Sequence, residues 1–204
     1  MNGGVDMFKN LLETESSWDF LQSTTLPIVI YGTGNGADRV FDEFEKLKIS
    51  ISAVCASDGF VRNRSFRGFQ VKPISQIESE YEDFVIVLCF ASPLAEVIDN
   101  IKALSKRHQV IMPSVPVFGD NIFNKDFLEK HIAKIELAYS HLADEQSRKV
   151  FENIIEFQIT GDLNYCFNCE TDKDEAFSIL KLGENESFLD LGAYRGDTVQ
   201  EFLQ

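Results

Sequence analysis

The sequence contains no long hydrophobic run. Its longest uninterrupted apolar stretch covers residues 84–91, whereas a helix that spans a membrane needs about 20 apolar residues. The first residues, 1–6, lack the apolar core of a signal peptide. We therefore expect no signal peptide, no transmembrane helix and no membrane partner.

Basic residues are also scarce. The 204 residues include 19 Lys and Arg against 33 Asp and Glu, which gives a net charge of -14. Binding along a nucleic acid depends on clustered Lys and Arg that neutralise phosphates, so we expect no nucleic-acid partner. Binding of a small anionic ligand is still compatible with this charge, because the backbone N–H groups at a helix N-terminus can hold a phosphate without a basic side chain.

Cysteine is limited to four residues. Cys55 and Cys89 lie in apolar, strand-like runs, which predicts buried free thiols and a cytoplasmic protein. Cys166 and Cys169 have the spacing of a zinc or redox pair. A structural zinc site needs a second pair of ligands, and the sequence near them supplies none, so we expect no metal site.

Apolar runs and amphipathic segments alternate through the first half of the chain. Strand-like runs cover residues 27–31, 49–56, 84–90 and 109–112, with helical patterns between them. Strands that alternate with helices form parallel sheets covered on both faces. The pattern predicts an α/β fold with a doubly wound, Rossmann-like parallel sheet, followed by a helical linker and a truncated second α/β domain.

The same patterns suggest where one part of the chain passes into the next. Two successive helical stripes that meet near Asp144 form the linker, and a glycine-containing turn follows them. The predicted parts are an N-terminal helical segment (1–25), a Rossmann-like domain (26–122), the helical linker (123–160) and the beginning of a methyltransferase domain (161–204).

A glycine-rich loop follows the first strand. Gly32, Gly34 and Ala37 match the dinucleotide fingerprint, with a further glycine at Gly36. In that fingerprint the first glycine permits a tight turn, the second admits a pyrophosphate, and the helix N-terminus adds partial positive charge. Asp58, at the end of the second strand, is placed to accept ribose hydroxyls. The alternative is a plain strand-to-helix turn with Asp58 as a solvated residue.

The loop after the second strand carries three arginines, Arg62, Arg64 and Arg67. They are placed either to hold a phosphate above the sheet or simply to face solvent.

The outline of this domain resembles a known group. The run Gly32-Thr-Gly-Asn-Gly-Ala, then Asp58, then Gly68-Phe-Gln-Val-Lys-Pro and the strand at Phe84 resemble the small Rossmann-like domains at the front of bacterial sugar-modifying acetyltransferases. The resemblance implies a site for a nucleotide-sugar or a regulatory nucleotide.

A second glycine turn lies near the end of the chain. The run Phe188-Leu-Asp-Leu-Gly-Ala-Tyr-Arg-Gly-Asp-Thr resembles the first S-adenosylmethionine motif of the FkbM-type methyltransferases, with Arg195 where an acid is often found. The resemblance implies a strand at Phe188 and a cofactor-binding turn. Asp190, Gly192 and Gly196 would approach the methionine part of the cofactor, and Asp197 would support the turn.

The resemblance implies a methyltransferase that uses S-adenosylmethionine and acts on a sugar or similar hydroxyl. The acid that such enzymes use for the ribose follows the next strand, which these residues do not include, so we expect the 204 residues to be inactive alone. The alternative is a non-catalytic module that binds a nucleotide or nucleotide-sugar. In both cases the partner is a small molecule, and a homodimer formed through exposed helices is left open.

Overall fold

The computed structural model describes residues 3–61, 64–116, 119–170, 173–183, 185–192 and 195–203. The chain divides into two compact units, Met1–Cys169 and Glu170–Gln204. The first unit contains the sheet, and the described residues of the second form two short helices.

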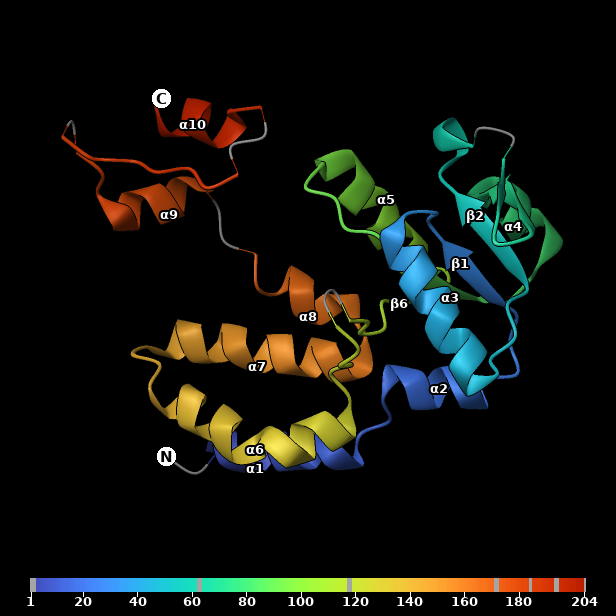
Figure 1. Ribbon diagram of the computed structural model, residues 1–204, viewed down its shortest axis with the longest axis horizontal. Coiled ribbons are helices and arrows are strands. Elements are labelled where there is room, and N and C mark those ends of the chain that lie inside the picture. The colour runs from blue at the N-terminus through green and yellow to red at the C-terminus, as the bar shows by residue number, and fades with distance from the viewer. Residues whose placement is uncertain are drawn as a thin grey trace. The chain divides into compact units, whose positions relative to one another are not determined.

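The first unit is built on a six-stranded sheet in the order β3-β4-β2-β1-β5-β6. Figure 1 labels its strands β1, β2 and β6. Every pairing is parallel except that of β3 with β4. The strands are β1 (Ile28–Tyr31), β2 (Ala53–Ala56), β3 (Ser65–Phe66), β4 (Phe69–Pro73), β5 (Val85–Leu88) and β6 (Gln109–Ile111). The predicted α/β fold class with a mostly parallel sheet is confirmed.

Helices connect the strands and follow them. In the first unit they are α1 (Gly3–Glu13), α2 (Ser17–Ser23), α3 (Asn35–Leu47), α4 (Ile74–Glu80), α5 (Ala95–Ser105), α6 (Lys125–Ser140), α7 (Glu145–Thr160) and α8 (Leu163–Phe167). A short 3-10 helix, η1 (Asp58–Phe60), follows β2. The predicted break near Asp144 is confirmed: this residue caps α7 by accepting a hydrogen bond from the Ser147 N–H at 2.7 Å.

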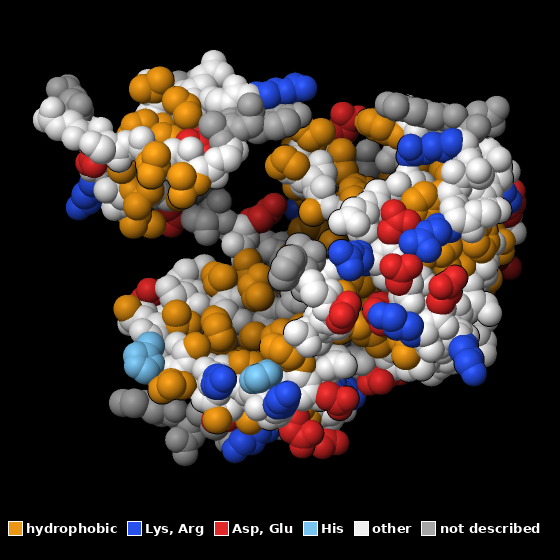
Figure 2. Space-filling view, in the orientation of Figure 1, with side chains coloured by type: hydrophobic (Ala, Val, Ile, Leu, Met, Phe, Trp, Pro, Cys, Tyr) orange, Lys and Arg blue, Asp and Glu red, His pale blue; other side chains and the backbone are white. Residues whose placement is uncertain are grey.

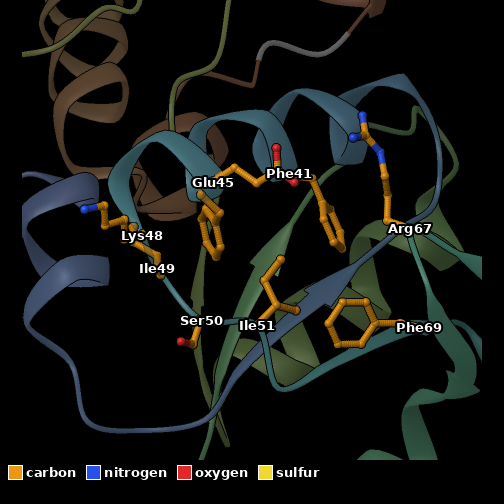
Figure 3. A pocket seen from close by; sticks show the side chains of 9 residues that line it. Phe41, Glu45, Lys48, Ile49, Ser50, Ile51, Arg67 and Phe69 are labelled. Atoms are coloured by element: carbon orange, nitrogen blue, oxygen red, sulfur yellow. The ribbon is translucent and has the colours of Figure 1, made fainter.

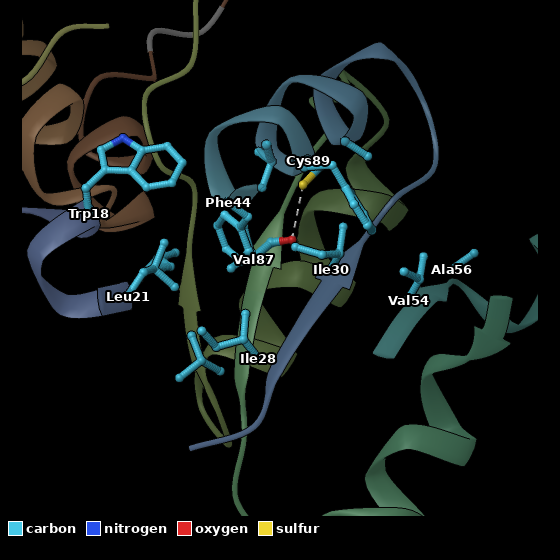
Figure 4. Close-up of a cluster of buried hydrophobic side chains, with 14 of the residues drawn as sticks. Trp18, Leu21, Ile28, Ile30, Phe44, Val54, Ala56, Val87 and Cys89 are labelled. Atoms are coloured by element: carbon cyan, nitrogen blue, oxygen red, sulfur yellow. Dashed lines mark hydrogen bonds between the residues drawn. The ribbon is translucent and has the colours of Figure 1, made fainter. Parts of the chain in front are cut away.

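Alternate residues of each strand face opposite sides of the sheet, and helices cover both sides. Ile28 and Ile30 face a core that includes residues of α2 and α3, which Figure 4 shows with Trp18, Leu21 and Phe44. The neighbouring positions on the strands face a second core with residues of α4, α5 and α8. Both faces of the central strands are therefore buried, as the continuous apolar run of β5 requires.

A third core lies among α1, α6 and α7. Phe8 is fully buried there, and its ring makes edge contacts with Tyr139 at 5.5 Å and Phe151 at 6.0 Å between centroids. The other buried members are Leu11, Leu128, Ile135, Ile155 and Ile159. The two helices of the predicted linker thus share a core with the first helix of the chain, while the predicted domain boundaries stay predictions.

The chain returns to the sheet directly after α7. Gly161 ends that helix with φ 68°, its carbonyl accepts a hydrogen bond from the Met112 N–H at 2.9 Å, and Asp162 pairs with Ile111 of β6. A β-carbon at Gly161 would lie 3.0 Å from the Met112 carbonyl oxygen. Glycine is therefore required here both for the left-handed turn and for the close approach.

Two predicted boundaries in the first unit are wrong. β2 begins at Ala53 instead of residue 49, because Ile49 and Ile51 pack against the core from the preceding connection. A serine followed by a proline, Ser92 and Pro93, predicts a helix start at Ser92, but helix α5 begins later, at Ala95. The Ser92 hydroxyl accepts a hydrogen bond from the Leu94 N–H at 3.2 Å, so it stabilises a turn before the helix.

The second unit contains α9 (Lys173–Leu180) and α10 (Asp197–Phe202). The strand predicted at Phe188 is wrong, since residues 186–190 are not assigned to a strand. A strand needs a neighbour to pair its N–H and C=O groups, and the described residues of this unit offer none. Phe188 instead stacks on Phe202 with 4.5 Å between ring centroids.

An ion pair between α2 and α6 gives a test of acid stability. The Asp19 carboxylate accepts hydrogen bonds from Lys125 at 2.9 Å and from the Ser16 N–H at 3.2 Å. The hydrogen bond from Lys125, followed by those from Ser16, lowers the pKa of Asp19. A carboxylate with a lowered folded-state pKa stabilises the fold above its unfolded pKa and loses that contribution as the pH falls through the folded value.

We therefore expect Asp19→Asn to lower the free energy of unfolding at about pH 7. It should match the unsubstituted protein once the pH lies below the lowered folded-state pKa of Asp19, where both side chains are neutral. Urea denaturation across this range measures the difference. Glu15→Gln, at an exposed position next to the same helix, serves as the control. An Asp19→Asn difference that stays constant across the range would contradict the assignment.

Candidate functional site

The first glycine loop joins β1 to α3. Gly32 adopts φ 120°, a conformation that L side chains rarely take, and its N–H donates to the Cys55 carbonyl at 3.0 Å. Gly34 is the N-cap of α3, so the first amide groups of this helix face the carboxyl ends of the strands. The predicted strand, glycine turn and helix are confirmed.

A cleft of about 480 Å³ lies beside this loop. Its floor comes from the end of β1, and its two walls come from the segments after β2 and β5, the strands that flank β1. The sheet order reverses here, which is where open α/β sheets bind their ligands. The lining residues are Tyr31, Gly32, Thr33, Ala56, Ser57, Phe60, Arg64, Phe90, Ala91, Ser92, Leu94 and Val97.

Two hydroxyl groups meet at the floor of the cleft. The Tyr31 and Ser57 hydroxyls are 2.6 Å apart and share a hydrogen bond. Burial raises the pKa of Tyr31, so its phenol acts as a neutral hydrogen-bonding group instead of a base. Neither residue is identified as a site residue by the sequence patterns. Each lies where an apolar strand ends, however, and polar residues at that position are a signal by which both could have been predicted.

One wall carries a guanidinium group. Arg64 donates a hydrogen bond to the Thr33 hydroxyl of the glycine loop. Arg67 lies elsewhere and pairs with Asp38 at 2.8 Å and Asp42 at 3.0 Å, both on α3. Of the three arginines in the predicted phosphate loop, the structure therefore places Arg64 at the cleft, and Arg62 lies outside the described residues.

Gly36 and Ala37 lie on the side of α3 that faces the sheet. A β-carbon at Gly36 would lie only 2.4 Å from the Cys89 carbonyl oxygen, whereas one at Gly34 would have nothing within 4 Å. Ala37 is fully buried. Gly36 and Ala37 thus allow close packing of α3 on the strands. A side chain at Gly34, in contrast, would project into open space.

Asp58 faces another helix. It is exposed at the start of η1, and its carboxylate accepts a hydrogen bond from the Ser75 N–H at 3.2 Å, in the first turn of α4. A carboxylate at a helix N-terminus is favoured by the helix dipole. The residue predicted to hold ribose hydroxyls therefore already has a structural partner.

A second hollow, of about 410 Å³, lies between α3 and β4 (Figure 3). It is lined by Phe41, Phe44, Glu45, Lys48, Ile49, Ser50, Ile51, Arg67 and Phe69. Phe41 and Phe44 belong to the hydrophobic core, and the arginine is held by the two acids of α3. We interpret this hollow as a groove in the packing of helix on sheet.

The second glycine turn lies in the second unit. Gly192 has φ 106°, Gly196 has φ 74°, and α10 begins at Asp197, so both glycines take conformations that favour glycine. One carboxylate oxygen of Asp190 is buried without a hydrogen-bond partner among the described residues. Leu189 and Leu191, on either side of it, are 79% and 87% exposed.

A strand that presents a cofactor-binding acid must itself be buried in a sheet. The exposed leucines around Asp190 do not meet this condition. The described residues of the second unit therefore do not form a complete S-adenosylmethionine site by themselves, although the glycine turn has the conformation that the motif predicts.

The two remaining cysteines, Cys166 and Cys169, are free thiols. Burial raises the pKa of Cys166 to about 11, so this thiol stays protonated near neutral pH. The Cys169 thiol donates to the Tyr165 carbonyl at 3.1 Å. In the part of the chain that the structure describes, no group of three or more His, Cys, Asp or Glu residues is arranged to hold a metal ion.

The surface shows mixed charge. On the face of the described residues that Figure 2 presents, basic side chains lie among acidic ones and form no continuous basic patch. None of the described helices combines the length and the apolar composition needed to cross a bilayer.

Comparison with known proteins gives one finding about the fold. No protein-family model matches the sequence, and no curated protein matches it. The crystal structure of the methyltransferase FkbM from Methylobacillus flagellatus KT matches with a TM-score of 0.54 and 13% sequence identity. The match covers 97% of this chain and 55% of that one, so the chain spans about half the length of the protein it resembles. At this identity the similarity shows a shared fold.

Proposed function

We propose that this chain is the N-terminal part of a methyltransferase of the FkbM type, dependent on S-adenosylmethionine and acting on a sugar or similar hydroxyl. We also propose that the cleft at the end of β1 binds a nucleotide or a nucleotide-sugar. The first part is supported by the fold shared with the FkbM structure over 97% of this chain and by the motif around Asp190.

The observation that carries the binding part is the cleft itself. Its volume of about 480 Å³ lies within the range of small-molecule sites, which runs from about 300 to 1,000 Å³. Its lining is mainly apolar with a few convergent polar groups, and it adjoins a glycine turn at a helix N-terminus. This combination suits a ligand with one anionic end and one flat or apolar end.

The methyl group would be supplied by S-adenosylmethionine when that cofactor is bound. In this proposal Asp190, Gly192 and Gly196 lie beside its methionine part, and Asp197 supports the turn. The remaining contacts to the cofactor would come from other residues of a complete second domain. A protein containing this chain and the complete second domain should transfer a labelled methyl group from S-adenosylmethionine to a sugar hydroxyl, and failure with a panel of nucleotide-sugars would contradict this part.

A non-catalytic binding module is the alternative function. Every described residue that lines the cleft belongs to the first unit. Ligand binding without methyl transfer would favour this alternative.

Gly34→Val tests the cleft. Gly34 has an extended backbone conformation and open space at its β-carbon, so valine fits without a clash but fills the approach to the α3 amides. We expect the affinity for the best ligand among UDP-sugars and NAD, measured by calorimetry, to fall at least about tenfold. We expect the free energy of unfolding to change by about 1 kcal/mol or less.

Gly59→Val is the matched control, because Gly59 also has open space at its β-carbon but belongs to η1 instead of the glycine loop at the start of α3. It should leave the affinity unchanged. If the unsubstituted protein binds none of these ligands, the binding proposal fails. S-adenosylmethionine is included as a third ligand, and we expect the 204 residues not to bind it.

A further inference from the structure

The charge of the cleft is confined to one wall. Among the described residues that line it, Arg64 is the only one that carries a charge. Its described hydrogen-bond partner is the neutral hydroxyl of Thr33, whereas Arg67, three residues later, has two carboxylate partners. Arg64 therefore brings positive charge to the glycine loop of a protein whose net charge is -14.

A guanidinium group at this position suits a phosphate. Its planar donors match the oxygens of a phosphate in a bidentate arrangement. Thr33, which Arg64 contacts, immediately precedes the N-cap of α3. The helix amides and Arg64 thus converge on the same end of the cleft, where an anionic group would gain from both.

The mouth of the cleft is apolar on both walls. Phe60 follows β2 and is 65% exposed, and Leu94 follows β5 and is 64% exposed. Because β2 and β5 flank β1, these two side chains belong to opposite walls. Large apolar side chains left exposed at a cleft suit a flat ring, which stacks well on an aromatic face.

The hydroxyl-binding groups of the cleft differ from those that the sequence predicts. Asp58 is hydrogen-bonded to the N-terminus of α4 and does not line the cleft. The paired hydroxyls of Tyr31 and Ser57 do line it. These neutral groups can donate to or accept from a sugar hydroxyl.

Resting on the proposed function, we propose a specific ligand class and orientation for this cleft. The ligand is a nucleotide, free or as part of a nucleotide-sugar, whose phosphate is held by Arg64 and the start of α3. Its base lies against Phe60 and Leu94. The ribose hydroxyls meet Tyr31 and Ser57 and make no contact with Asp58.

The test compares a nucleotide with its nucleoside by calorimetry, using UDP with uridine and ADP with adenosine. Arg64→Gln is expected to lower the affinity for the better-bound diphosphate about 10- to 100-fold, the effect of losing a hydrogen bond to a charged group. It should leave the affinity for the nucleoside unchanged. Arg67→Gln, the matched arginine outside the cleft, should change neither.

Two further variants test the other contacts. Phe60→Ser should lower the affinities for nucleoside and nucleotide alike. Asp58→Asn should leave both affinities unchanged. Thermal unfolding of each variant checks that it is folded. Arg64 and Phe60 are both exposed, so their substitution should not disturb the core.

The outcomes separate this inference from the proposed function. Suppose that a nucleotide binds. If Arg64→Gln then lowers the affinities for nucleotide and nucleoside equally, or lowers neither affinity, the orientation is wrong while the proposed function stands. If inorganic pyrophosphate binds as tightly as the nucleotide, the base contact is wrong. If no nucleotide or nucleotide-sugar binds the unsubstituted protein, the binding part of the proposed function itself fails.

Discussion

Replacing Gly36 by alanine is expected to lower the free energy of unfolding by about 3 kcal/mol. The added β-carbon would lie 2.4 Å from the Cys89 carbonyl oxygen, which is backbone following β5 and has little freedom to move. Helix α3 must therefore shift away from the sheet, and contacts of Val40 and Phe44 with the core weaken. Urea denaturation followed by circular dichroism measures the change.

The control for this result is Gly34→Ala, two residues earlier in the same glycine run. Its β-carbon would meet no atom within 4 Å, so the expected cost is about 1 kcal/mol or less. Equal destabilisation by the two substitutions would show that α3 does not approach the strand as closely as described.

The contrast between these glycines shows what the sequence can predict and what it cannot. The apolar run before Gly32 and the amphipathic pattern after Ala37 predict the strand and the helix, because both depend on local periodicity. The same pattern gives Gly36 no particular role. The structure shows that Gly36 lets α3 approach the backbone at Cys89, and this contact depends on a strand far along the chain.

Phe8→Ala is expected to lower the free energy of unfolding by about 3–5 kcal/mol. The side chain is fully buried and contacts the rings of Tyr139 and Phe151. Its removal leaves a cavity where α1 meets α6 and α7, and three packed helices collapse only partly into such a space. Urea denaturation measures the loss.

Phe60→Ala, the same substitution at a residue that is 65% exposed, is the control and should change the free energy of unfolding by less than about 0.5 kcal/mol. A small effect of Phe8→Ala would mean that α1 contributes little to the stability of the first unit. The sequence alone predicts the helix around Phe8 but cannot show its partners, which lie more than a hundred residues later.

The candidate site was predictable only where it depends on local pattern. Gly32 and Gly34 follow from the spacing of glycines after an apolar strand. The bond from Ser75 to Asp58 and the contact of Arg64 with Thr33 join segments that only the folded chain brings together. The strand expected at Phe188 fails for a related reason, because a strand depends on a neighbour and local apolar pattern does not supply one.

The segments beside β4 and β6 have a consequence for how the protein behaves at high concentration. Parallel sheets end in strands whose free N–H and C=O groups can pair with another molecule and start aggregation. At one end of this sheet the short β3 pairs antiparallel with β4. At the other end Asp162 and the Gly161 carbonyl pair with the chain at Ile111 and Met112. Both exposed borders of the sheet are thus partly occupied by the protein's own backbone, which disfavours intermolecular strand addition.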